Sequence, residues 1–253
     1  MKTILITGGG GYIGRELCKR LSEEGGADLQ IVACDIAKMA AADKLPGVAY
    51  EMSDIRSPEF KIMMERVRPQ VVVHLASIVA AGGDPEFEYS VDVMGTKNVL
   101  ESCLSAGVAQ IVVTSSGAAY GYHEDNPEWL SETDPLRGNE DFAYSRHKRM
   151  VEELLAEYRV KHPELKQLIF RPGSVIGENV SNQITAIFER PFILGIAGSD
   201  CAFVFIWDRD VVSCITGGIL NGQEGIYNLA GDGAMPMREI AKVLGKPYLP
   251  LPA

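Results

Sequence analysis

The sequence has no long hydrophobic run and contains little cysteine or histidine. No segment reaches the roughly eighteen uninterrupted apolar residues that a membrane-spanning helix needs. The apolar run at the N-terminus is too short for a signal peptide. The five cysteines lack any C-x-x-C spacing and the four histidines are dispersed, so no metal site is expected. We therefore expect reduced thiols and a cytoplasmic protein.

Basic residues are also in deficit. The chain has 24 Lys and Arg against 34 Asp and Glu, which gives a formal net charge of −10. Nucleic acids and anionic membranes attract basic surfaces, so neither is an expected partner. With 46% hydrophobic and 23% charged residues over 253 positions, the composition predicts a globular protein with one large core and a small appended lobe.

The sequence does contain a regular alternation of short apolar runs and amphipathic segments. Runs rich in Val and Ile predict buried parallel strands at Lys2–Thr7, Leu29–Cys34, Val48–Met52, Gln70–Leu75, Ile111–Ser115 and Leu165–Phe170. Segments with helical spacing predict helices between them at Tyr12–Glu24, Pro58–Val67, Pro85–Ala106 and Phe142–Lys161. This order predicts an α/β fold, a doubly wound parallel Rossmann sheet, as a dinucleotide-binding domain over residues 1–172.

The pattern loosens after Pro172. Helices are predicted at Gln183–Glu189, Asp208–Leu220 and Met237–Leu244, with short strands at Phe203–Ile206 and Ile226–Leu229. We expect residues 173–253 to form a small substrate-binding lobe that is partly interleaved with the first domain. Relatives are expected to continue beyond the last residue, so we expect either a truncated lobe or an unusually open substrate pocket.

A glycine-rich loop follows the first predicted strand and opens a helix. Gly8, Gly11 and Gly14 fit T-G-x-x-G-x-x-G, a pattern that lets the backbone turn and approach a pyrophosphate at the helix N-terminus. Asp35 lies 21 residues after Gly14, at the end of the second strand. An acid there accepts hydrogen bonds from the adenosine ribose and repels a 2′-phosphate, so NAD is predicted over NADP. The alternative interpretations are that the glycines form only a tight turn and that Asp35 is a solvated acid at the end of a strand.

Further candidates lie at the next two strand ends. Asp54 and Ile55 follow the third strand, where Asp would hold the adenine amino group and Ile would contact the adenine face. A turn-forming Asp fits the spacing equally well. His74 ends the fourth strand beside the cofactor crevice, and we prefer to interpret it as a packed histidine.

Tyr144 and Lys148 form a Y-x-x-x-K motif on a predicted helix. Residues four apart share a helix face, so the Lys148 charge would favour tyrosinate and lower the pKa of Tyr144. Tyr144 would then exchange a proton with a substrate hydroxyl during hydride transfer, and Lys148 would also hold the nicotinamide ribose. Ser116, just after the fifth strand, would hydrogen-bond the same substrate oxygen. The alternative is an ordinary amphipathic helix face.

Together these motifs resemble the extended short-chain dehydrogenase/reductases, the NAD-dependent epimerase/dehydratase family. The similarity covers residues 7–14, 35, 54–55, 74–77, 95–100, 115–121, 144–148, 171–177 and 227–231. It implies a catalytic triad of Ser116, Tyr144 and Lys148. It implies contacts with NAD from Gly8, Gly11, Tyr12, Ile13, Gly14, Asp35, Asp54, Ile55, Leu75, Ala76, Tyr144 and Lys148. Substrate contacts are expected from Ser77, Ser116, Ser174 and Asn182.

Three departures from the family pattern bear on the reaction. Asp92 stands where the family usually has Asn. A carboxylate cannot donate a hydrogen bond, so any contact that the family's Asn makes as a donor is in doubt at this position. Gly117 and Ala118 replace the carboxylates that the family's dehydratases and decarboxylases use, so neither reaction is expected. Phe203 stands where nucleotide-sugar epimerases commonly carry an arginine for the substrate diphosphate, which weakens the case for a nucleotide sugar.

The resemblance therefore implies an NAD-dependent oxidoreductase with a small-molecule substrate. We expect reversible hydride transfer at a secondary alcohol or ketone of a small sugar-like or hydroxylated molecule. One alternative is a nucleotide-sugar epimerase that retains its NAD, and another is a non-catalytic dinucleotide-sensing module, which typically lacks the Tyr or the Lys. A homodimer is expected through the helices at Pro85–Ala106 and Phe142–Lys161, because the second carries excess apolar surface. The alternative is that this surface faces the chain's own sheet.

Overall fold

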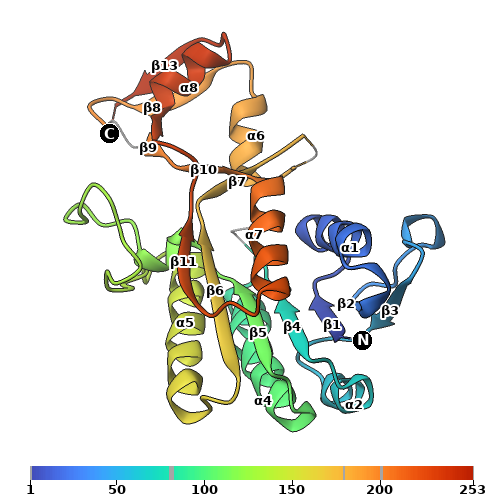
Figure 1. Ribbon diagram of the computed structural model, residues 1–253. Helices are drawn as coiled ribbons and strands as arrows, with labels where there is room; N and C mark the ends of the chain where they lie inside the picture. The colour runs from blue at the N-terminus through green and yellow to red at the C-terminus, as the bar shows by residue number, and fades with distance from the viewer. Residues whose placement is uncertain (1, 80–82, 179, 200–201, 253) are drawn as a thin grey trace.

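A seven-stranded parallel sheet forms the centre of the computed structural model, which describes residues 2–79, 83–178, 180–199 and 202–252 (Figure 1). The strand order is β11-β6-β5-β4-β1-β2-β3, and every neighbouring pair is parallel. The strands are β1 (Lys2–Thr7), β2 (Leu29–Asp35), β3 (Val48–Met52), β4 (Val71–His74), β5 (Gln110–Thr114), β6 (Lys166–Pro172) and β11 (Gly225–Leu229). The order reverses between β1 and β4, so the predicted doubly wound fold is confirmed.

Helices cover both faces of this sheet, and each face has its own core. On one side lie α1 (Tyr12–Glu24) and α7 (Asp208–Leu220), and on the other α2 (Pro58–Val67), α4 (Thr96–Ala106) and α5 (Ala143–Lys161) (Figure 1). Side chains alternate along a strand, so Ile4 and Ile6 of β1 pack toward α1 while Leu5 packs toward α2 and α4. Both strand faces are buried, which explains why the strands appear in the sequence as continuous apolar runs.

The predicted helix over Pro85–Ala106 is not regular. It consists of α3 (Pro85–Tyr89), the π-helical segment η3 (Ser90–Gly95) and α4. A π segment adds a residue to the turn and redirects the side chains within it. Here it carries Asp92, whose carboxylate accepts hydrogen bonds from residues that follow β4. Hydrophobic spacing does not reveal such a change of turn.

The segment after residue 172 returns to the main sheet. β11 pairs with β6, and α7 packs on the α1 side of the sheet. The smaller elements are the strand pairs β7 (Ser174–Ile176) with β10 (Phe205–Trp207), β9 (Ala202–Phe203) with β12 (Met235–Pro236), and β8 (Ile193–Ile196) with β13 (Tyr248–Leu251), and the helices α6 (Gln183–Glu189) and α8 (Met237–Val243). The strand predicted at Phe203–Ile206 is therefore split at Val204 between two different pairs. The division into domains at residue 172 stays a prediction.

Three expectations from the composition concern membrane spans, metal sites and thiols. None of the helices within them is long and apolar enough to cross a membrane. The same residues contain no group of His, Cys, Asp and Glu side chains that could hold a metal ion. Cys18, Cys34, Cys103 and Cys214 are free thiols, whereas Cys201 lies outside the described residues. Burial raises the pKa of the Cys18 thiol to about 12, so it stays protonated at neutral pH.

Candidate active site

The glycine loop is held tightly between β1 and the start of α1. Gly8 has a φ of +68°, a conformation that favours glycine, and a Cβ there would lie 2.8 Å from the Ala76 backbone nitrogen. A Cβ on Gly14 would overlap the Gly8 carbonyl oxygen. Glycine at these two positions therefore lets β1, the loop and α1 pack against each other and against the segment after β4.

The N-terminus of α1 fits an anion such as a dinucleotide pyrophosphate. Gly11 is its N-cap, and no side chain caps the helix. Gly11 is exposed, and a Cβ on it would meet only the Gly8 carbonyl oxygen, so space remains above the helix end. Uncapped first-turn N–H groups and the helix dipole favour a phosphate here. The Tyr12 hydroxyl donates to the Asp208 carboxylate of α7, which leaves Tyr12 and Ile13 their backbone groups for such a ligand.

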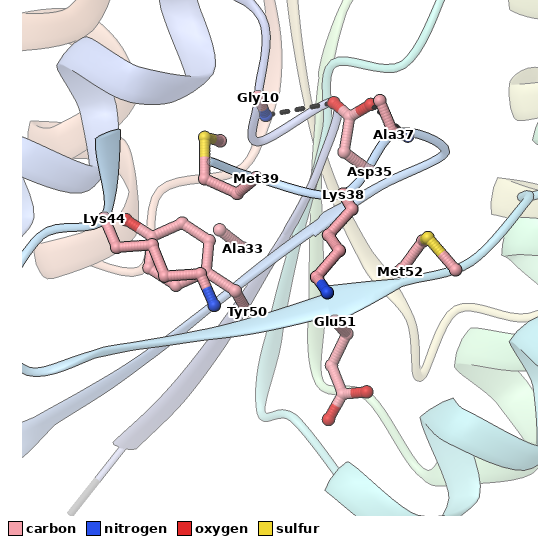
Figure 2. A pocket seen from close by; sticks show the side chains of 10 residues that line it. All are labelled: Gly10, Ala33, Asp35, Ala37, Lys38, Met39, Lys44, Tyr50, Glu51 and Met52. Atoms are coloured by element: carbon pink, nitrogen blue, oxygen red, sulfur yellow. Dashed lines mark hydrogen bonds between the residues drawn. The ribbon is translucent and has the colours of Figure 1, made fainter. Parts of the chain in front are cut away.

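A pocket of about 250 Å³ lies beside this loop, at the ends of β2 and β3 (Figure 2). Asp35 stands at one side, where its carboxylate accepts from the backbone nitrogens of Gly10 at 3.0 Å and Ala37 at 3.2 Å. Lys44 stands at the other, with its ammonium 5.3 Å from the centre of the Tyr50 ring. The glycine loop and an acid at the end of β2 thus share one cavity, which fits the adenosine half of a dinucleotide.

Asp54 and Ile55 are already engaged within the protein. Both Asp54 carboxylate oxygens accept from the Arg56 guanidinium, the shortest bond being 2.6 Å, and this holds the pKa of Asp54 below its usual value. The Ile55 side chain is buried and packs toward Gly95. A role for this pair in binding adenine stays a prediction, and the Asp54 carboxylate would have to share its oxygens with Arg56.

The end of β4 contacts the glycine loop directly. The Leu75 nitrogen donates to the Thr7 carbonyl at 3.2 Å, and Ala76 adjoins Gly8. His74 is buried between the hydroxyls of Thr7, at 2.8 Å, and Thr96, at 3.0 Å. Burial, helped by the Lys148 charge, lowers the pKa of His74 to about 3, so this histidine is neutral and packed.

Tyr144 and Lys148 lie one turn apart on α5. The Lys148 ammonium is 5.5 Å from the centre of the Tyr144 ring and donates to the Ser77 Oγ at 2.9 Å. Lys148 is buried, whereas Tyr144 is partly exposed. Within the described part of the chain, the Tyr144 hydroxyl has no hydrogen-bond partner, which leaves it available to a substrate.

Ser116 lies at the start of a short 3₁₀ helix, η4 (Gly117–Tyr120), which packs on the beginning of α5. Its Oγ accepts from the Ala118 nitrogen at 3.1 Å. Ser145, the neighbour of Tyr144, donates to the Ala118 carbonyl at 2.6 Å. These bonds bring the segment of Ser116 to the same end of the sheet as Tyr144, while the triad itself stays a prediction.

Asp92, where the family usually has Asn, makes its side-chain hydrogen bonds as an acceptor. Its Oδ1 accepts from the Ser77 hydroxyl and from the Ile78 nitrogen, each at 2.9 Å. Whether a donor contact made by the family's Asn is lost here stays a prediction. Ser77, a predicted substrate residue, lies between Asp92 and Lys148.

The two remaining substrate candidates lie in the smaller elements. Ser174 begins β7 and donates through its backbone to the Val204 carbonyl. Asn182 caps α6, and its Oδ1 accepts from the nitrogens of Ile184 and Thr185 at 2.9 Å. A substrate contact for either residue stays a prediction.

A buried ion pair holds α5 against the sheet, and the sequence reasoning missed it. Glu152 lies two turns after Tyr144, on the face that also carries Lys148. It accepts from the Arg171 guanidinium at 2.6 Å and from the Ser115 hydroxyl at 2.6 Å. Arg171 in turn donates to the Tyr120 hydroxyl at 2.7 Å. The spacing of Tyr144, Lys148 and Glu152 at intervals of four residues is the signal that could have revealed this third member of the face.

Comparison with known proteins agrees with this geometry. The model of the NAD dependent epimerase/dehydratase family matches residues 4–198. The chain belongs to this family. The prediction from the motifs is thereby confirmed, together with NAD as the cofactor after which the family is named. It is a family of enzymes.

Several of the individual proteins to which this chain is similar are UDP-glucose 4-epimerases. The one from Erwinia amylovora is 31% identical over 194 residues, which cover 72% of this chain and 56% of that protein. The one from Yersinia enterocolitica is 26% identical and covers 82% of this chain and 66% of that protein. The Thermus thermophilus enzyme, solved with NAD, superimposes with a TM-score of 0.82 at 27% identity, covering 99% of this chain and 86% of that structure. The chain thus spans only part of the length of its curated relatives.

Proposed function

We propose that this protein uses NAD(H) to oxidise a secondary alcohol, or to reduce the matching ketone, on a small sugar-like or hydroxylated substrate. The observation that carries the proposal is the Tyr144–Lys148 pair, whose ammonium is bonded to Ser77 directly after β4. β4 is the neighbour of β1, which carries the glycine loop. NAD, when bound, supplies the hydride acceptor or donor.

The residues of this chain bind the cofactor, orient the substrate and transfer the proton. Gly8, Gly11 and Gly14 shape the loop for the pyrophosphate, and Asp35 accepts from the adenosine ribose. Tyr144 takes a proton from the substrate hydroxyl during oxidation and returns it during reduction. The roles of Lys148 and Ser116 follow from where these residues lie.

Lys148 stabilises the tyrosinate by its positive charge and holds the nicotinamide ribose. Ser116 donates to the substrate oxygen, which orients it toward Tyr144. We also propose that residues 1–172 bind the dinucleotide. Residues 173–253, with Ser174 and Asn182, then face the substrate.

A nucleotide-sugar epimerase with retained NAD is the second candidate, and the relatives favour it. Phe203 argues against a diphosphate at the position where an arginine is common, because an apolar ring offers no charge-assisted bonds. The two candidates differ in their kinetics. Cofactor that copurifies with the protein and remains bound through turnover favours the epimerase, whereas stoichiometric release of NADH favours the dehydrogenase.

The deciding experiment pairs a substrate screen with the variant Tyr144→Phe. Sugars, sugar acids and nucleotide sugars are screened for NADH formation and for epimer formation. On any substrate found, Tyr144→Phe should lower turnover by roughly 10²- to 10⁴-fold while NAD affinity changes less than about tenfold. Tyr122→Phe, the same change at an exposed neighbouring tyrosine, is the matched control. Near-normal turnover of Tyr144→Phe would refute the mechanism, whereas NAD binding without turnover of any substrate would favour a dinucleotide-sensing module.

We further propose a cytoplasmic homodimer. The four described cysteines are free, which fits a reducing compartment. Val151 and Leu155 of α5 are buried in the chain's own core, so much of that apolar surface is already used. Phe87 and Met94, each 47% exposed, lie on the other helix expected at the interface. Light scattering at micromolar concentration should give twice the chain mass, and Phe87→Glu should lower it.

A further inference from the structure

Lys148 carries a positive charge in a place where water cannot neutralise it. Its side chain is only 6% exposed, yet no carboxylate of the described residues lies within salt-bridge distance of its ammonium. A buried charge is costly unless an opposite charge or several hydrogen bonds compensate it. The hydrogen bond to Ser77, together with the Tyr144 ring, provides only part of that compensation.

The Asp92 carboxylate is connected to Lys148 through the hydroxyl of Ser77. An ammonium can only donate, so Ser77 Oγ must accept from Lys148 and is left with its own proton to donate. That proton goes to Asp92 Oδ1, also at 2.9 Å. Two hydrogen bonds in series, each 2.9 Å long, therefore run from Lys148 through Ser77 to the carboxylate. The ammonium and the carboxylate are thus no more than about 6 Å apart, within the range where opposite charges shift titrations strongly.

The backbone fixes the Asp92 carboxylate in this position. The Ile78 nitrogen donates to the same Oδ1 at 2.9 Å, and Asp92, which is 3% exposed, lies in the π segment η3. An N–H donor and an O–H donor converge on one oxygen, so the arrangement requires an acceptor at position 92. A carboxylate meets that requirement with either oxygen and adds a full negative charge.

Other titratable groups surround Asp92, and among the described residues none of them is linked to Lys148 through a comparable pair of hydrogen bonds. His147 Nδ1 is 3.9 Å from Asp92 Oδ2, and both of its ring nitrogens lack hydrogen-bond partners in the same part of the chain. Burial lowers the pKa of His147, an effect that Arg146 and Lys148 reinforce and that Asp92 and Glu88 oppose. His74 lines the same small cavity as Asp92 and is neutral as described above.

We infer that Asp92 is the counter-ion of Lys148, acting through Ser77, and that it is a positioning residue that sets the pH range in which Tyr144 can accept a proton. This inference rests on the proposed function. Asp92 does not touch the reacting atoms. It acts by holding the ammonium at Ser77 and by offsetting part of the positive potential that Lys148 exerts on Tyr144.

The sign of the effect follows from the charges. When both are protonated, Tyr144 and Lys148 together carry one positive charge. The negative charge of Asp92 favours the protonated pair, so its removal lets the pair lose a proton at lower pH, whichever of the two groups releases it. We therefore expect the tyrosinate absorbance in Asp92→Asn to appear at lower pH than in the unaltered protein.

The experiment needs no substrate. The absorbance of tyrosinate is titrated in the full-length protein that carries Tyr122→Phe, because Tyr144 helps to raise the pKa of its neighbour Tyr122. The matching curve with Tyr144→Phe added is then subtracted, which isolates Tyr144. Asp92→Asn should shift this curve to lower pH, whereas Glu88→Gln, which removes a second buried carboxylate next to His147, should shift it much less. Equal shifts in the two variants, or no shift in Asp92→Asn, would overturn the inference. Once a substrate is known, the acid limb of kcat/KM should move by the same amount.

A second pair of variants covers a failure of Asp92→Asn to fold. Ser77→Ala breaks the connection without touching either charge and should shift the titration in the same direction by less, and Ser77→Thr should restore the original curve. A titration that Ser77→Ala leaves unmoved would contradict the inference. Failure of the proposed function looks different, because Tyr144→Phe would then turn over normally whatever the titration shows.

Discussion

The substitution Gly11→Ala should weaken NAD binding and leave the stability of the fold nearly unchanged. Gly11 has φ −70° and ψ 170°, which any residue adopts, and it is exposed. An added Cβ would meet one heavy atom within 4 Å, the Gly8 carbonyl oxygen at 3.1 Å. Alanine also reduces the entropy of the unfolded chain, which offsets part of the close contact. The free energy of unfolding should therefore change by less than about 1 kcal/mol.

Binding of NAD should respond far more strongly. The methyl group would stand at the uncapped end of α1, where the pyrophosphate is expected to accept from backbone N–H groups. Hydrogen bonds to charged groups contribute about 1.5–3 kcal/mol each, so displacement from two of them costs about 3–6 kcal/mol. Affinity for NAD should then fall by roughly 10²- to 10⁴-fold.

Calorimetric titration with NAD and urea unfolding without it measure the two effects separately. Gly14→Ala is the contrasting variant, because its Cβ would overlap the Gly8 carbonyl and approach the Gly9 Cα within 2.8 Å. That backbone cannot yield easily, so Gly14→Ala should lose about 1–3 kcal/mol of stability as well as affinity. A folded Gly11→Ala protein that binds NAD like the wild type would show that the pyrophosphate does not lie at this helix end.

Other perturbations test the pocket, the ion pair and the buried histidine. Asp35→Ala should narrow the preference for NAD over NADP in paired titrations, because it removes both the ribose acceptor and the repulsion of a 2′-phosphate; an unchanged ratio would contradict this. Arg171→Met leaves the Glu152 carboxylate buried without its counter-ion and should lower the free energy of unfolding by about 3–5 kcal/mol in urea. A loss below about 1 kcal/mol would refute it. His74 has its pKa lowered from 6.5 to about 3, so the unfolded chain takes up a proton that the folded chain refuses, and stability should fall as pH drops from 6.5 toward 3. His74→Gln should flatten that slope.

The main sheet could be predicted from the sequence because its strands are buried on both faces. Such strands are nearly continuous apolar runs, and the helices between them keep an amphipathic stripe, so the bounds of α1 and α2 match their predictions. The short pairs β8–β13 and β9–β12 have no such signal. They contain two to four residues each, and Pro236 and Pro250 lie within them. A strand this short is defined by its partner rather than by its own pattern.

The residues of the candidate site could be predicted from the sequence, whereas the hydrogen bonds and the ion pair that connect them could not. A glycine loop, an acid at a strand end and Y-x-x-x-K are local patterns, and each has its own physical reason. The bond from Lys148 to Ser77 joins positions 71 apart, and the Arg171–Glu152 pair is set by the register of α5 on the sheet. For Asp92, the sequence identifies the departure but not its consequence, since whether a side chain donates or accepts depends on the groups that face it.

The topology explains why these distant groups meet. In a doubly wound sheet the crevice opens where the strand order reverses, here between β1 and β4. The glycine loop leaves β1 on one side of that reversal, and Ser77 follows β4 on the other. α5 is the crossover between β5 and β6, so its first turns lie at the same end of the sheet, and Lys148 reaches across to Ser77. One hydrogen bond therefore joins α5 to the segment after β4, and this bond is the route by which we propose that a change at Asp92 affects Tyr144 although the two residues lie on different helices.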